Sequence, residues 1–213
     1  MANLDTLTID VFARRLEEIL ENERNRIKTN AAVNIEVLDK LLTLAEKIEQ
    51  LLVDETIIPR KWAGRLFELN RLLISEIETI QLPLSIPVKK TLYFSEKVSD
   101  IFGTRINVIE CAKSDLEISF YLSQIDEFYL DICFSARMEK RMNKAAFDKL
   151  GTILAEVLIY LDERDTIARA LMRYLFSLWE QVYTESEYTL KGSELRQAEV
   201  EFANKIVKIF GKE

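Results

Sequence analysis

Hydrophobic positions in the N-terminal third of the chain recur every three or four residues, which is the spacing of amphipathic helices. A first helix is predicted from Thr8, with the apolar positions Ile9, Phe12, Leu16, Ile19, Leu20 and Ile27. A second is predicted after Asn34, with the apolar positions Leu38, Leu41, Ala45, Ile48 and Leu52. Between them, segment 29–34 either turns at its asparagines, which are good helix caps, or continues as one long helix. The turn is the preferred interpretation.

A third helix is predicted from Pro59, because proline is well tolerated in a first helical turn. Its expected buried face is Trp62, Leu66, Leu69, Leu73, Ile77 and Ile80. Segment 82–87 contains two prolines and is predicted to be non-helical, because each proline disfavours helical geometry in the preceding residue. This segment divides the chain into an N-terminal helical region, 1–82, and a second region, 83–213, although the two can pack as one domain. A short helix is expected from Ser95 to Gly103.

The middle of the chain changes to a two-residue period. Apolar residues alternate with more polar ones at Leu116, Ile118, Phe120 and Leu122, and again at Phe128, Leu130, Ile132 and Phe134. Because the polar segment 123–126 separates the two runs, the pattern is typical of a β-hairpin. Segment 105–112 is a weaker candidate for a third strand. A small antiparallel sheet, covered by helices on one face, is therefore predicted here.

Helical spacing returns in the last third of the chain. One helix carries Phe147, Leu150, Leu154, Val157 and Leu161, a second begins near Asp165, and a third follows Gly192 and Ser193. No repeat period is found along the chain. The predicted fold class is α+β and predominantly helical, with about six amphipathic helices and a hairpin or three-stranded antiparallel sheet inserted mid-chain.

The chain of 213 residues contains no histidine. Histidine is the usual general base near neutral pH and the commonest metal ligand, so its absence excludes Ser-His-Asp and Cys-His sites and histidine-bound zinc. The sequence also has no glycine-rich phosphate-binding motif, and its carboxylates do not follow a metal-binding pattern. These observations predict a protein that is not an enzyme and has no cofactor; the alternative is an enzyme with an unfamiliar carboxylate or lysine site, because helical bundles can host sites without a short sequence signature.

The net charge and the cysteine content limit which binding partners and which cellular compartment are expected. The net charge of −7 argues against general nucleic-acid binding. The two cysteines, Cys111 and Cys133, are too few for a disulfide framework and are interpreted as small buried residues. Neither a signal peptide nor an apolar run long enough to span a bilayer is found, which predicts a cytoplasmic protein without a membrane partner.

Four basic residues follow the predicted hairpin at helical spacing: Arg137, Lys140, Arg141 and Lys144. If a helix begins near Arg137, all four lie on one face, where they oppose the helix dipole. An anionic partner, either nucleic-acid phosphates or an acidic protein surface, would relieve that repulsion. Alternatively, these cations pair with the chain's own acids or remain solvated. A helix that begins near Asn143 would leave the first three in a loop.

The large aromatic residues and the broad apolar faces give the last expectations. Residues predicted to lie in the core are Trp62, Phe67, Phe147, Phe176, Trp179 and Phe202. Nearly consecutive apolar residues at 69–74 and 154–159 make these helices apolar on two sides, which predicts self-association as a twofold homodimer. The leading functional hypothesis is a non-enzymatic protein–protein interaction or assembly subunit, a scaffold or adaptor. The alternative is a nucleic-acid-associated subunit that contacts phosphates through Arg137, Lys140, Arg141 and Lys144.

Overall fold

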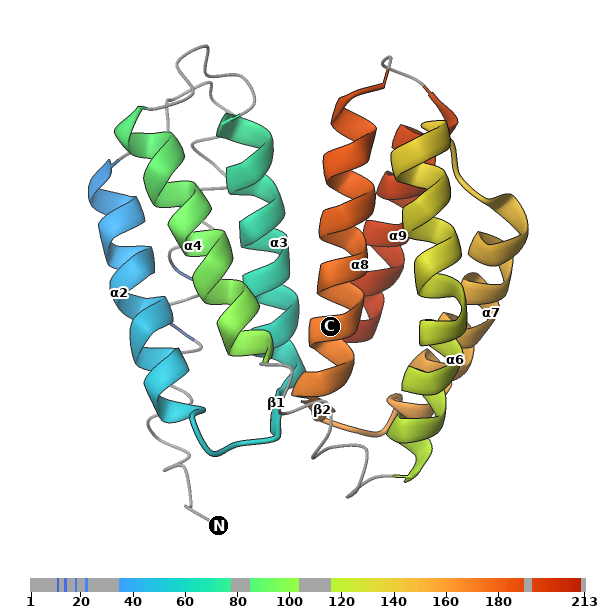
Figure 1. Ribbon diagram of the computed structural model, residues 1–213. Helices are drawn as coiled ribbons and strands as arrows, with labels where there is room; N and C mark the ends of the chain where they lie inside the picture. Colours follow the sequence, from blue (N-terminus) through green and yellow to red (C-terminus); the bar gives the residue numbers. More distant parts are fainter. Residues whose placement is uncertain are drawn as a thin grey trace.

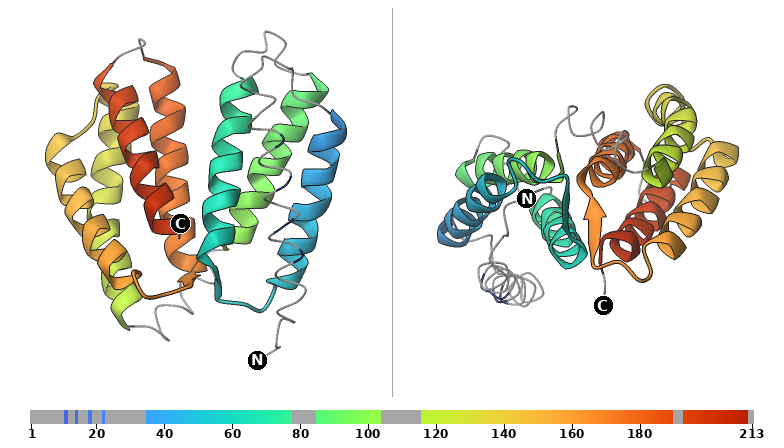
Figure 2. Two further views of the ribbon diagram at one scale, coloured as in Figure 1. Left: turned by 180° about the vertical axis from the view of Figure 1, so that it is seen from behind. Right: turned by 90° about the horizontal axis from the view of Figure 1, so that it is seen from below.

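The computed structural model describes residues 35–77, 85–103, 116–189 and 193–211, together with the isolated helical positions 11, 14, 18 and 22. Its helices form two halves that stand side by side (Figure 1). The first half contains α2 (Ile35–Leu51), α3 (Arg60–Ile77) and α4 (Ile86–Phe102), and the second contains α6 (Leu116–Phe134), α7 (Lys144–Tyr160), α8 (Arg169–Glu187) and α9 (Glu194–Phe210). The views from behind and from below show the same division (Figure 2).

Two short strands join the halves at their base. β1 (Ile57–Pro59) pairs antiparallel with β2 (Thr166–Ala168), and Ile58 lies opposite Ile167 at the centre of the register. The predominantly helical α+β class is therefore confirmed. The sheet has two strands and lies between residues that are far apart in the sequence, whereas the prediction placed it in the middle of the chain.

The predicted hairpin at 116–134 is wrong, because these residues form helix α6. In a helix, residues two positions apart point about 200° away from each other, so a helix that is apolar on opposite faces also shows a two-residue alternation. Ile118 and Ile132 are buried in α6, whereas Phe120 and Leu130 are exposed. The third-strand candidate at 105–112 lies outside the described residues.

Most other predicted helices are confirmed, with shifted ends. The predicted faces of α2, α3 and α7 are largely buried, and Ser193 caps α9 by accepting a hydrogen bond from the backbone N–H of Arg196. Helix α4 ends before Gly103 as predicted, but it begins at Ile86, earlier than the predicted Ser95. The proline-rich segment is therefore helical from Ile86 onward, because Pro87 lies in the first turn, where no intrahelical hydrogen bond is lost.

Three sequence predictions concern regions that the structure leaves largely undescribed. The first predicted helix is described only at positions 11, 14, 18 and 22, all of which are helical, and segment 29–34 lies outside the described residues. Helix α4 packs against α2 and α3, so residues on both sides of position 82 contribute to the first half. The division of the chain into regions 1–82 and 83–213 stays a prediction.

The two halves repeat one structural unit, so the expectation that the chain lacks a repeat is wrong. Helix, strand, helix and helix follow one another as α2, β1, α3 and α4 and again as α7, β2, α8 and α9. From α2 to α3, each residue of the first half has its equivalent 109 positions later, in the segment from α7 to α8; Arg60 and Arg169 are such a pair. From the starts of α4 and α9, the offset is 108 positions. Both copies contain Ile-x-Arg-x5-Leu-Phe-x-Leu, at 58–69 and 167–178, and Phe-Gly, at 102–103 and 210–211.

Two equivalent arginines, Arg60 and Arg169, bind the halves to each other, and we call them the capping arginines. Arg169 donates hydrogen bonds to the carbonyl oxygens of Leu52 (2.5 Å) and Glu55 (2.8 Å), just beyond α2. It also donates to Asp100 (2.9 Å) and Ile101 (2.8 Å) at the end of α4. A cation at a helix C-terminus satisfies free carbonyl groups and interacts favourably with the helix dipole.

Arg60 makes the reciprocal contacts in the second half. It donates to the carbonyl oxygens of Leu161 (2.6 Å), next to α7, and of Lys208 (3.2 Å) and Ile209 (3.0 Å) in α9. These acceptors are the repeat equivalents of Leu52, Asp100 and Ile101. The exchange of equivalent contacts across an antiparallel strand pair indicates an approximate twofold relation between the halves.

An aromatic cluster forms the core between the halves. Phe67, Phe102, Phe176 and Phe210 are fully buried and meet edge to face, with ring centroids 5.2 to 6.2 Å apart. Gly64 permits this close approach, because a Cβ atom there would lie 2.8 Å from the Cα of Gly211. All six aromatic residues predicted to lie in the core are buried, which confirms that prediction.

Candidate functional site

The most prominent exposed feature of the described surface is one face of α6. Helix α6 packs against α7 and α8, and its other face carries residues that we call the α6 stripe: Phe120, Ser123, Glu127, Leu130, Phe134 and, just beyond the helix, Met138. Steps of three and four residues place them along one side of a helix. Phe120 is 55% exposed, Leu130 73%, Phe134 62% and Met138 66%. Four large apolar side chains are thus available for contact along one line.

A π-helical turn, η1 (Ser135–Glu139), continues α6 and carries Met138. Such a turn has more residues than an α-helical turn, so the four-residue step from Phe134 to Met138 stays close to one turn. The hydroxyl of Ser135 donates to the carbonyl oxygen of Ile132 (3.1 Å) and accepts a hydrogen bond from the backbone N–H of Asn143 (3.0 Å). Ser135 therefore ties the end of α6 to the start of α7.

The helix that would place the four basic residues on one face does not begin near Arg137; it begins beside Asn143, which is the alternative considered above. Helix α7 begins at Lys144, with Asn143 as its N-cap, so Arg137 lies in η1 while Lys140 and Arg141 lie in the connection. Asn143 accepts a hydrogen bond from the backbone N–H of Ala146, which fixes this late start. All four basic residues are exposed, but they do not share one helix face.

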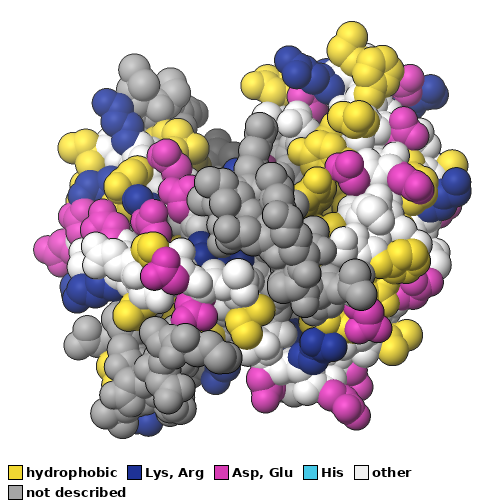
Figure 3. Space-filling model, turned by 60° about the horizontal axis from the view of Figure 1, so that its bottom comes forward, with side chains coloured by type: hydrophobic (Ala, Val, Ile, Leu, Met, Phe, Trp, Pro, Cys, Tyr) yellow, Lys and Arg dark blue, Asp and Glu magenta, His cyan; other side chains and the backbone are white. Residues whose placement is uncertain are grey.

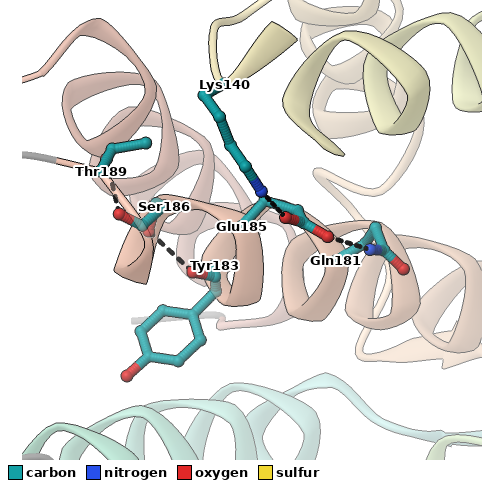
Figure 4. A network of polar contacts seen from close by, with 6 residues as sticks. All are labelled: Lys140, Gln181, Tyr183, Glu185, Ser186 and Thr189. Carbon is teal, nitrogen blue, oxygen red and sulfur yellow. Dashed lines mark hydrogen bonds and ion pairs between the residues drawn. The ribbon is translucent and has the colours of Figure 1, made fainter. Parts of the chain in front are cut away.

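Two of these cations pair with acids of the same chain. Lys140 lies 2.5 Å from a carboxylate oxygen of Glu185, and Arg141 lies 2.7 Å from Glu139. Figure 4 shows that Gln181 contacts the same Glu185 carboxylate, on the side away from Lys140. Lys140 also lies 5.3 Å from the ring centre of Tyr188. Within the described part of the chain, Arg137 and Lys144 make no ion pair.

A second polar region lies between α4 and α8. Burial raises the pKa of Glu180 to about 6, while Arg173 and a hydrogen bond from Ser95 on α4 act in the opposite direction. Nearby on α4, the Thr91 hydroxyl is buried and has no hydrogen-bond partner in the described structure. Glu180, Arg173 and Ser95 make the contact between the halves more polar here than at the phenylalanine cluster.

In the second half, a buried polar pair on α8 and α9 is hydrogen-bonded, whereas the equivalent pair in the first half is not. Trp179 on α8 donates a hydrogen bond to Glu199 on α9 at 2.7 Å. The repeat equivalents of these two residues are Asn70 and Thr91, both fully buried and neither with a side-chain hydrogen-bond partner in the described structure. Buried polar groups without partners are costly, so these two positions lower stability.

Cys133 lies on α6, half-buried and packed against the core. Burial raises the pKa of its thiol to about 11 and that of neighbouring Tyr129 to about 12. A thiol of such high pKa is protonated at neutral pH and weakly nucleophilic. This environment supports the interpretation of Cys133 as a small core residue, while Cys111 lies outside the described residues.

Acidic and cysteine side chains within the described segments form no group of three or more that could hold a metal ion. None of the described helices is long and apolar enough to cross a membrane. On the lower face of the molecule, hydrophobic and acidic side chains are interspersed over the half that contains α6–α9 (Figure 3).

No family model, curated protein or solved structure is significantly similar to this chain. The fold defines a two-repeat helical protein in which an apolar face of α6 is exposed.

Proposed function

We propose that this protein is a non-enzymatic interaction or assembly subunit that self-associates through the exposed apolar face of α6. The α6 stripe is the observation that carries this proposal. Helix α6 packs one face against its own half and leaves Leu130 and Phe134 on the opposite face largely exposed. A helix that is apolar all round is normally buried, and contiguous exposed apolar surface commonly marks an interaction site.

The alternative, phosphate binding by the four basic residues, has less support. Lys140 and Arg141 are engaged by Glu185 and Glu139, which leaves Arg137 and Lys144 on different elements. Two separated cations on a protein of net charge −7 form a weak electrostatic surface for nucleic acid.

Sedimentation equilibrium between 5 and 200 µM would test the proposal. We expect the parent protein to be dimeric at the upper end of this range, and the double variant L130E/F134E to be monomeric because it places two charges in the contact. The matched control is I159E, since Ile159 is 76% exposed on α7 but lies outside the α6 stripe. A parent protein that is monomeric at 200 µM would contradict the proposal.

A further inference from the structure

We infer that the α6 stripe is covered by the same stripe of a second copy, running antiparallel about a twofold axis midway between Leu130 and Phe134. This inference rests on the proposed function, because it requires self-association. It adds the direction of the two helices and the charged residues that meet.

The net charge of this surface changes sign along its length. Helix α6 contains four acids, Glu117, Asp126, Glu127 and Asp131, and no basic residue. The turn and connection after it carry Arg137, Lys140 and Arg141 together with Glu139, and because Lys140 and Arg141 pair with Glu185 and Glu139, Arg137 is the one of these three cations that makes no ion pair within the described part of the chain. Parallel packing of two copies would place like charges side by side, whereas antiparallel packing places the acidic part of each copy near the basic part of the other. The surface is therefore complementary to itself, as an isologous twofold contact requires.

Glu127 and Arg137 set the register of the contact. An axis midway between Leu130 and Phe134 also lies midway between Glu127 and Arg137. Within one chain these two residues are ten positions apart, about 15 Å along a helix, and so they cannot pair with each other. Both are exposed, and neither makes an ion pair within the described part of the chain.

Across the axis, Leu130 of each copy faces Phe134 of the other, and Glu127 of each copy faces Arg137 of the other. The two apolar pairs form the centre of the contact, and one ion pair lies at each end. This is the usual division between an apolar interface core and a charged rim. A contact one helix wide lies at the small end of specific interfaces, so dissociation constants in the micromolar range are expected.

Charge reversal at these two positions tests the inference. In R137E, two glutamates face each other at each end of the contact, and in E127R, two arginines do. Each single variant is expected to raise the dimer dissociation constant about tenfold, because like charges replace opposite ones at two places per dimer. The double variant E127R/R137E restores opposite charges and is expected to return to within about threefold of the parent protein. R65E, which reverses a charge on α3 in the first half, is the matched control.

Sedimentation equilibrium at low salt, with circular dichroism to confirm helix content, gives the readout. Weakening by both single variants with recovery in the double variant would support the antiparallel pairing. A parent dimer that neither single variant weakens would overturn the inference while leaving self-association intact. Weakening by both singles without recovery would also overturn this register. A parent protein that stays monomeric would remove both the inference and the proposed function.

Discussion

Replacing Arg169 with methionine should reveal how strongly the two halves stabilise each other. The Arg169 side chain is 4% exposed, and its guanidinium donates four hydrogen bonds to carbonyl groups near the ends of α2 and α4 in the first half. Burial lowers its pKa, with Glu49 and Glu55 acting in the opposite direction, but an arginine remains charged at neutral pH. Methionine approximates the length of the aliphatic stem and removes every donor.

The magnitude follows from the hydrogen bonds and the desolvation of the charge. A hydrogen bond to a charged group contributes about 1.5–3 kcal/mol, so four of them give an upper bound of about 6–12 kcal/mol. The variant no longer buries a cation, which offsets part of this loss, but it leaves buried carbonyl groups without donors, at a cost of about 1–3 kcal/mol each. We therefore expect R169M to lower the free energy of unfolding by about 3–5 kcal/mol.

Urea unfolding followed by circular dichroism measures this change. R60M is expected to cost a similar amount, because Arg60 makes the equivalent contacts in the second half. The control is R65M, since Arg65 is partly exposed and its only described ion pair, to Glu68, spans 3.9 Å; its cost should stay below about 0.5 kcal/mol. If R169M lost less than about 1 kcal/mol, the capping arginines would not hold the halves together as argued.

Two further changes test buried polar groups, one on α4 and one on α8. T91V removes a buried hydroxyl that has no described partner, so it should raise the free energy of unfolding by about 1 kcal/mol. The control T152V, on the exposed side of α7, should change the free energy of unfolding by less than about 0.5 kcal/mol. If T91V were less stable than the parent protein, the Thr91 hydroxyl would not be an unsatisfied buried group. Because burial raises the pKa of Glu180 from 4.5 to about 6, its contribution to stability is fully present below pH 4.5 and is lost as the pH rises through 6. E180Q should therefore reduce the difference in unfolding free energy between pH 4.5 and pH 8 by up to about 2 kcal/mol. The control E201Q, at an exposed position, should leave this difference unchanged. If E180Q also left it unchanged, Glu180 would not be the source of this pH dependence.

Helix faces were predictable from the sequence because burial follows the 3.6-residue period directly. Leu66, Leu69 and Leu73 of α3 are buried as expected, as are Leu150 and Leu154 of α7. Helix ends were less predictable. The start of α4 was misplaced because a proline in the first turn is compatible with a helix, although proline elsewhere ends one.

The basic residues show why the candidate site could not be derived from spacing alone. The positions of Arg137, Lys140, Arg141 and Lys144 match a helix face only if one regular helix contains all four. A π turn and a left-handed Lys140 interrupt that regularity, and Asn143 begins the next helix. Their charge partners, such as Glu185 for Lys140, come from a distant part of the chain.

The repeat was missed because the two copies share only scattered residues, several of them in the contact between the halves. The two copies share Ile58 and Ile167 in the strands, the capping arginines, and Phe67 and Phe176 in the aromatic cluster. These residues are buried between the halves, whereas most of the intervening positions differ. A signal of this kind is found by searching for a spaced pattern such as Ile-x-Arg-x5-Leu-Phe-x-Leu, and overall similarity does not reveal it.

The error at 116–134 and the proposed interaction surface have the same physical origin. A helix with one apolar face shows a period of 3.6 residues, and it shows alternation of apolar residues only when apolar side chains also occupy the opposite face. In α6, Ile118 and Ile132 supply the buried face, and Phe120, Leu130 and Phe134 supply the exposed one. The second face lies largely outside the packing of the described chain, so its apolar character calls for another explanation. Local patterns that disagree with the fold tend to occur where function constrains the sequence, which supports the proposal that the α6 stripe is an interaction surface.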